Sequence, residues 1–169
     1  MNFALVAMPR SGTSWASVWL MDGALCYHDP LATMSPEELL AFRPGKRWGI
    51  SCTASWLLDG FLEAAGCPVV VIDNDLEEVQ RSLLEMGAPA LTRGAVEMFD
   101  RLTFPRFQMD DLFDEDGARE IWTILRPDMP MDVERWKLLS QLKIQPDFYK
   151  WKPDPKIMRE ALERFMGGV

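Results

Sequence analysis

The residues best suited to chemistry lie in one short stretch near the start of the chain. They are an arginine, a glycine and three hydroxyl-bearing residues between a proline and a tryptophan, in the order Pro9-Arg10-Ser11-Gly12-Thr13-Ser14-Trp15. The stretch follows an apolar run typical of a buried strand and precedes a run typical of a helix. Backbone N–H groups of such a loop and of the first helical turn converge on one point, where the helix dipole adds positive charge. The pattern therefore predicts a phosphate-binding loop. A capped helix start without a ligand is the simpler alternative, but it needs only one hydroxyl.

Comparison with the Walker A pattern narrows the kind of phosphate. That pattern has Gly, four residues, Gly, Lys and then Ser or Thr. With Gly12 on the second glycine, Thr13 stands where the lysine is expected and Ser14 takes the hydroxyl position. The nearest cation is Arg10. The missing lysine argues against a kinase or ATPase that binds the β- and γ-phosphates of a nucleoside triphosphate.

The same seven residues resemble the 5′-phosphosulfate loop of the sulfotransferases, in which Pro, then Lys or Arg, precede Ser-Gly-Thr-Thr/Ser. This resemblance implies transfer of a sulfuryl group from 3′-phosphoadenylyl sulfate to a hydroxyl or amine acceptor, without a metal. It also implies that the loop binds the donor through Arg10, Ser11, Gly12, Thr13, Ser14 and Trp15. Arg10 would further stabilise charge on the bridging oxygen as the phosphosulfate bond breaks.

A second sulfotransferase signature is only partly present. In that family an Arg at a strand end and a Ser eight positions later hold the 3′-phosphate of the donor. The corresponding residues here are Asn74 and Ser82. Asparagine brings no charge, and a charge-assisted bond is about twice as strong as a neutral one. Either Arg81 or another cation compensates, or the 3′-phosphate is bound weakly, or the donor differs. Ser82 also has the simpler interpretation of a helical serine, and the family's C-terminal Arg-Lys-Gly segment has no match.

The catalytic base is expected at His28 or Asp29. Sulfotransferases use a His or a Glu to remove the acceptor's proton, and His28 is the only histidine of the chain. Histidine titrates near neutral pH, which suits this role. The alternative is a polar turn in which Asp29 acts as a cap.

The pattern of apolar runs and breakers predicts alternating strands and helices. We expect strands at 3–8, 24–27, 47–52 and 68–73, and helices at 12–21, 37–42, 56–65, 76–86, 91–102, 132–142 and 156–166. Residues 103–116 are expected to form a loop with a short turn, 121–125 a late strand or short helix, and 143–146 an extended segment. This order predicts a single domain over 1–169, in the α/β class. The expected architecture has three layers, α/β/α, with a mainly parallel sheet, and is similar to that of P-loop NTPases. The loops at 9–14, 28–30, 53–55 and 73–75 should then meet at the carboxyl edge of the sheet.

Composition excludes several classes of function. The net charge is −8, from 18 basic and 26 acidic residues, which argues against a nucleic-acid binder and an anionic membrane surface. Cys26, Cys52 and Cys67 lack the spacing of metal ligands, so we expect no metal site and a reduced, cytoplasmic setting.

The expected partner is a small-molecule acceptor, and the oligomeric state is left open. Five aromatic residues either line a pocket for the acceptor or for the adenine of the donor, or pack in the core. They are Trp48, Trp56, Phe99, Phe104 and Phe107. Two other functions remain open: a nucleotide- or anion-binding protein without transferase activity, and a small-molecule kinase on the same fold.

Overall fold

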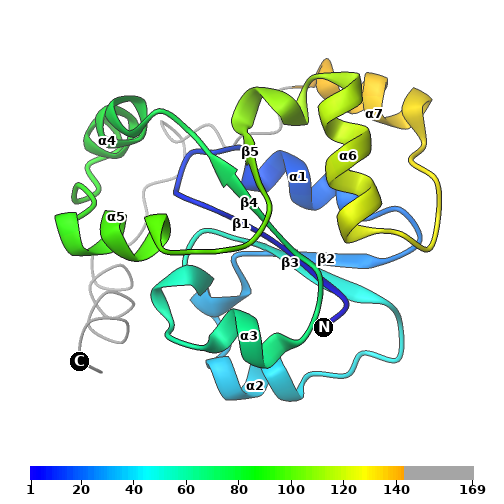
Figure 1. The fold of residues 1–169 in the computed structure, drawn as a ribbon, viewed down its shortest axis with the longest axis horizontal. Helices are drawn as coiled ribbons and strands as arrows, with labels where there is room; N and C mark the ends of the chain where they lie inside the picture. The colour runs from blue at the N-terminus through cyan, green and yellow to red at the C-terminus, as the bar shows by residue number, and fades with distance from the viewer. Residues whose placement is uncertain (143–169) are drawn as a thin grey trace.

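A five-stranded parallel sheet forms the centre of the molecule (Figure 1). The computed structural model describes residues 1–142, and everything below concerns this range. The strand order is β2-β3-β1-β4-β5, and every neighbouring pair is parallel. The strands are β1 (Phe3–Ala7), β2 (Leu25–His28), β3 (Trp48–Cys52), β4 (Val69–Asp73) and β5 (Arg106–Gln108). The predicted α/β class with a parallel sheet is confirmed.

Helices cover both faces of the sheet. One layer contains α1 (Thr13–Leu20), α6 (Glu115–Leu125) and α7 (Val133–Ser140). The other contains α2 (Pro36–Ala41), α3 (Phe61–Ala65), α4 (Leu76–Glu85) and α5 (Arg93–Asp100). Figure 1 shows the first layer near α1 and the second around α2, α3, α4 and α5.

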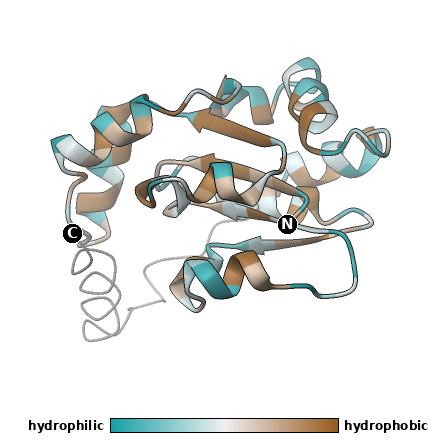
Figure 2. Ribbon diagram, turned by 60° about the horizontal axis from the view of Figure 1, so that its bottom comes forward, coloured by the Kyte–Doolittle hydropathy of each residue, from teal (hydrophilic) through white to brown (hydrophobic). Residues whose placement is uncertain are grey.

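The central strand β1 contributes to a separate apolar core on each face. Phe3, Leu5 and Ala7 pack toward α1 and α6, and Ala4 and Val6 pack toward the opposite helices. Side chains alternate along a strand, so a strand covered on both faces is apolar throughout. In Figure 2 the strands in the middle carry much of the hydrophobic colouring.

The predicted helix at 56–65 is wrong. The chain forms a 3-10 turn, η2 (Ser55–Leu57), and then starts the short helix α3 at Phe61. Gly60 precedes α3 with φ of 68°, a left-handed conformation that interrupts helical hydrogen bonding. The apolar spacing suited one helix, but the backbone turns at the glycine.

The predicted loop at 103–116 is also wrong, because it contains regular structure. It holds the edge strand β5, the 3-10 turn η3 (Met109–Leu112) and the start of α6. Strand β5 has only three residues, two of them exposed, and so lacks an apolar run. The ambiguous segment 121–125 is the second half of α6, capped by Asp114. The expectations for 143–146 and 156–166 lie outside the described residues.

Two arginines hold the carboxyl end of α1. Arg135 donates to the carbonyl oxygens of Val18 and Trp19, each at 2.6 Å, and Arg126 donates to that of Leu20 at 3.0 Å. The Arg126 side chain is 1% exposed. Cations at this end of a helix satisfy free carbonyls and complement the dipole. These contacts fix the helix whose amino end follows the predicted phosphate loop.

The two glycines in the first turns of α5 and α6 make a matched stability test. A Cβ on Gly117 would lie 2.7 Å from the Asp111 carbonyl oxygen, whereas one on Gly94 would meet nothing within 4 Å. Alanine is favoured over glycine in a helix by up to about 1 kcal/mol. We expect Gly94→Ala to raise the free energy of unfolding by up to that amount. Gly117→Ala should lower it by about 1–3 kcal/mol through overpacking. Urea unfolding measures both changes, and equal stabilisation by the two variants would contradict the close packing of α6 on η3.

Candidate functional site

The loops that follow β1, β2, β3 and β4 meet at the carboxyl edge of the sheet. Side-chain hydrogen bonds connect them, from Asn74 to Arg10, from Ser51 to Thr13 and from Thr53 to Asp29. The chain leaves β1 toward one face through α1, and leaves β3 and β4 toward the other. This change of face is where ligands bind in open α/β sheets. The predicted convergence of the four loops is confirmed.

The loop between β1 and α1 turns twice through left-handed backbone. Gly12 has φ of 76° and Arg10 has φ of 69°. A Cβ on Gly12 would lie 3.1 Å from the Leu112 side chain, so glycine suits both the backbone and the space. Gly12 is the N-cap of α1 and gives its first turn no side-chain cap. The N–H groups of that turn therefore keep the donor capacity that an anion at a helix amino end uses.

Arg10 connects this loop to helix α4. Its Nε donates to Ser82 Oγ at 2.8 Å, across 72 residues of sequence. The Asn74 amide donates from Nδ2 to the Arg10 carbonyl oxygen at 3.3 Å and accepts from the Asp75 N–H at 2.9 Å. Asn74 thus supports the unusual backbone of Arg10. The three residues predicted to hold the donor's phosphates on this side are brought together.

Two further arginines near this cluster have acidic partners. Arg106 donates to both carboxylate oxygens of Asp73, at 2.6 and 2.9 Å, and this bond raises the pKa of its guanidinium. Arg81 lies on the exposed side of α4, 3.5 Å from Glu78. Among the described residues, the guanidinium that hydrogen-bonds to Ser82 is that of Arg10 and not that of Arg81 or Arg106.

On the other side of the loop, hydroxyls and an imidazole gather. The Nε2 atom of His28 lies 3.2 Å from the hydroxyl oxygens of both Thr13 and Ser14. It also lies 3.2 Å from Asp29 Oδ2. Asp29 Oδ1 accepts from the Thr53 N–H at 2.6 Å and from its hydroxyl at 3.0 Å. The sequence places Thr53 in a loop at the carboxyl edge of the sheet but does not indicate this contact with Asp29. Its position directly after a predicted strand was the available signal.

Three of the predicted donor-binding residues are buried: Thr13, which contacts His28, and Trp15 and Ser11, which do not face the other loops. Trp15 is 3% exposed, and its indole N–H donates to the Leu139 carbonyl oxygen at 2.9 Å. Its ring packs against that of Trp19 in the core beneath α1 and against that of the exposed Phe113. Ser11 is fully buried, and among residues 1–142 its hydroxyl has no hydrogen-bond partner. Any contact of these two residues with a nucleotide therefore stays a prediction.

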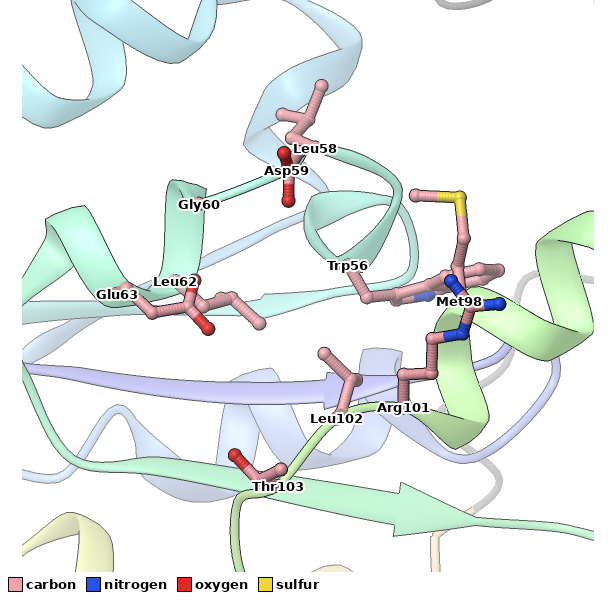
Figure 3. Close-up of a pocket in the computed structure, with 10 residues that line it drawn as sticks. All are labelled: Trp56, Leu58, Asp59, Gly60, Leu62, Glu63, Met98, Arg101, Leu102 and Thr103. Carbon is pink, nitrogen blue, oxygen red and sulfur yellow. The ribbon is translucent and has the colours of Figure 1, made fainter.

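A cavity of about 450 Å³ lies apart from these clusters, between α3 and α5 (Figure 3). Trp56, Met98 and Arg101 lie together on one side of it, and Leu62 and Glu63 lie across from them. Among the five aromatic residues considered for an acceptor pocket, Trp56 is the one that lines it. The Trp56 indole N–H donates to the carbonyl oxygen of Ala7, the last residue of β1, at 3.1 Å. Trp48 and Phe99 are core residues, as the simpler interpretation expected.

Over residues 1–142, no group of three or more His, Cys, Asp or Glu side chains is placed to hold a metal ion. No helix in that range is long and apolar enough to cross a bilayer.

Burial controls the chemistry of the three thiols. It raises the pKa of Cys52 to about 12 and that of Cys67 to about 11, and it raises the pKa of Cys26 as well. Thiolate is the reactive form. We expect a thiol reagent at pH 8 to modify the half-buried Cys67 slowly and to leave Cys26 and Cys52 unmodified until the protein unfolds. Mass spectrometry of labelled peptides measures this, and fast labelling of Cys52 in the folded protein would contradict its burial.

Comparisons with known proteins bear on the fold. No family model matches the sequence, and no curated protein matches it significantly. Among solved structures, the chain is similar to the mouse sulfotransferase SULT7A1 complexed with PAP, with a TM-score of 0.54 and 15% sequence identity. The alignment covers 98% of this chain and 83% of that one. At this identity the likeness concerns the fold: a sulfotransferase has the same arrangement of a parallel sheet flanked by helices.

Proposed function

We propose that this protein transfers a sulfuryl group from 3′-phosphoadenylyl sulfate to a hydroxyl or amine of a small-molecule acceptor. The observation that supports this most is the hydrogen bond between Arg10 and Ser82. It joins the two segments, far apart in sequence, that resemble the donor site of sulfotransferases. The similarity in fold to a sulfotransferase complexed with PAP, or adenosine 3′,5′-bisphosphate, supports the same assignment.

In this proposal each side of the phosphate loop has its own role. The amino end of α1 binds the 5′-phosphate, together with the hydroxyls of Thr13 and Ser14. The acceptor oxygen or nitrogen forms a bond to sulfur while His28 takes its proton. The bond between sulfur and the bridging oxygen breaks, and the electron pair stays on the 5′-phosphate of the departing PAP. The positive charge of Arg10, which lies beside Ser82, offsets the negative charge that develops on the nucleotide as the bond breaks.

A nucleotide-binding protein without transferase activity is the second candidate, favoured by Asn74. Both ends of this amide have partners within the protein, and it adds no charge for a 3′-phosphate. The kinase alternative requires Mg-ATP binding, although Thr13 stands where Walker loops have lysine. Calorimetric titrations with PAP and with Mg-ATP separate a sulfotransferase donor site from a kinase site, and turnover of 3′-phosphoadenylyl sulfate separates an enzyme from a protein that only binds the nucleotide. Binding of PAP supports the donor site, binding of Mg-ATP alone supports a kinase, and binding of neither rules out both nucleotide sites.

Removal of the Arg10 guanidinium should weaken PAP binding and leave the fold intact. A hydrogen bond to a charged group contributes about 1.5–3 kcal/mol, so we expect Arg10→Ala to raise the Kd for PAP roughly 10- to 100-fold. Arg93→Ala is the matched control, because Arg93 is exposed and pairs with Glu97 on α5. Calorimetry should show its Kd within about threefold of wild type, in line with the small contribution of exposed ion pairs. An unchanged Kd in Arg10→Ala would show that the loop is wrongly assigned.

Removal of the His28 imidazole should separate binding from turnover. General-base catalysis contributes typically about 10²–10⁴-fold in rate, so we expect His28→Ala to lower PAP formation from 3′-phosphoadenylyl sulfate by at least 10². The Kd for PAP should change little, because Thr13, Ser14 and Arg10 remain. The assay needs an acceptor found by screening phenols and amines with the wild type. A fully active His28→Ala would move the base to Asp29 or elsewhere.

A further inference from the structure

The Nε2 atom of His28 faces three oxygen atoms at equal distance. The hydroxyls of Thr13 and Ser14 and the Oδ2 atom of Asp29 all lie 3.2 Å from it. Among the described residues, no group hydrogen-bonds to the other ring nitrogen, Nδ1, and the side chain is 37% exposed. The two nitrogens of one imidazole are therefore in different surroundings, and a neutral ring carries its proton on only one of them.

The orientation of the Asp29 carboxylate is set by Thr53, the residue that follows strand β3. Oδ1 accepts two hydrogen bonds from Thr53, which leaves Oδ2 toward the ring. The backbone of Asp29 is held as well, because its N–H donates to the Ser51 carbonyl oxygen at 3.0 Å. Its φ of 43° is a left-handed conformation that an aspartate adopts more readily than most residues. The carboxylate is thus a fixed acceptor next to Nε2.

An ionised carboxylate only accepts hydrogen bonds, whereas a hydroxyl both donates and accepts. If Nε2 carried a lone pair, that lone pair would face the carboxylate and the contact would be repulsive. A proton on Nε2 makes the contact a charge-assisted hydrogen bond, which is stronger than a neutral one. Because the Nε2 proton goes to the carboxylate, the hydroxyl hydrogens of Thr13 and Ser14 stay available to phosphate oxygens.

We propose that Asp29 is a positioning residue that keeps the proton of neutral His28 on Nε2, so that Nδ1 is the atom that takes the acceptor's proton. The catalytic part of this assignment rests on the proposed sulfuryl transfer. When the acceptor's proton bonds to Nδ1, the ring becomes an imidazolium whose Nε2–H already points at the Asp29 carboxylate. The same carboxylate that sets the tautomer therefore stabilises the charge that forms.

The tautomer can be measured directly, because His28 is the only histidine of the chain. Long-range ¹H–¹⁵N NMR at alkaline pH, where histidine is neutral, distinguishes the protonated ring nitrogen from the bare one. We expect the wild type to show its proton on Nε2. In Asp29→Asn, Thr53 still requires an acceptor, so the Asn oxygen stays there and the NH₂ group faces Nε2. A donor at that place should move the ring proton to Nδ1, as in the triad of serine proteases, where the equivalent change lowers kcat by about 10⁴.

Asp59→Asn is the matched control, since Asp59 is exposed and lies at the cavity beside α3. It should leave the tautomer unchanged. A wild type with its proton on Nδ1, or an Asp29→Asn that keeps the wild-type tautomer, would overturn the proposal. The wild-type spectrum alone is decisive if the variant fails to fold. Titration of PAP into the same sample tests the proposed function separately. The expected tautomer without PAP binding would remove the sulfotransferase assignment and, with it, the catalytic role of Nδ1, which would overturn that part of the proposal.

Discussion

The site depends on one constraint: helix α1 must begin directly beyond the central strand, in a turn that leaves its first N–H groups uncapped. Strand β1 is fully buried between two neighbours, so its carboxyl end is fixed within the sheet. The left-handed backbone at Arg10 and Gly12 makes the turn possible. At the other end, Arg126 and Arg135 bind the last carbonyl oxygens of α1. Both ends of the helix are thus set by contacts outside it, and its positive end lies at the sheet edge where four loops meet.

The loops divide the edge into two chemically different sides. One side has the guanidinium of Arg10 with Ser82 and Asn74, and the other has the imidazole of His28 with Asp29 and Thr53. A transfer from a phosphosulfate needs positive charge toward the leaving group and a base toward the acceptor. The two sides offer these separately, with the amino end of α1 between them. This separation is the physical basis for the proposed reaction, and it follows from placing the strands that precede the two sides on opposite flanks of β1.

Local chemistry in the sequence predicted much of the fold. The β-branched run predicted as a strand at 68–73 forms β4, which lies between β1 and β5 in the sheet. The predicted helix at 37–42 is present as α2 (Pro36–Ala41), which Ser35 and Glu38 cap in a reciprocal capping box. The errors arose where the decisive contact is distant. Gly60 breaks a helix that apolar spacing alone would continue, and the polar strand β5 exists because it pairs with β4. The carboxyl-edge loops were predicted because parallel strands must end together. The bond from Asn74 to the Arg10 backbone was not, because spacing says nothing about contacts across 64 residues.

A crystal structure of the protein with PAP would test the central claim most directly. The account predicts that the 5′-phosphate lies within hydrogen-bond distance of the backbone N–H groups of Thr13 and Ser14, with the ribose 3′ side toward Ser82. PAP bound in the cavity between α3 and α5, or a 5′-phosphate away from the amino end of α1, would contradict it.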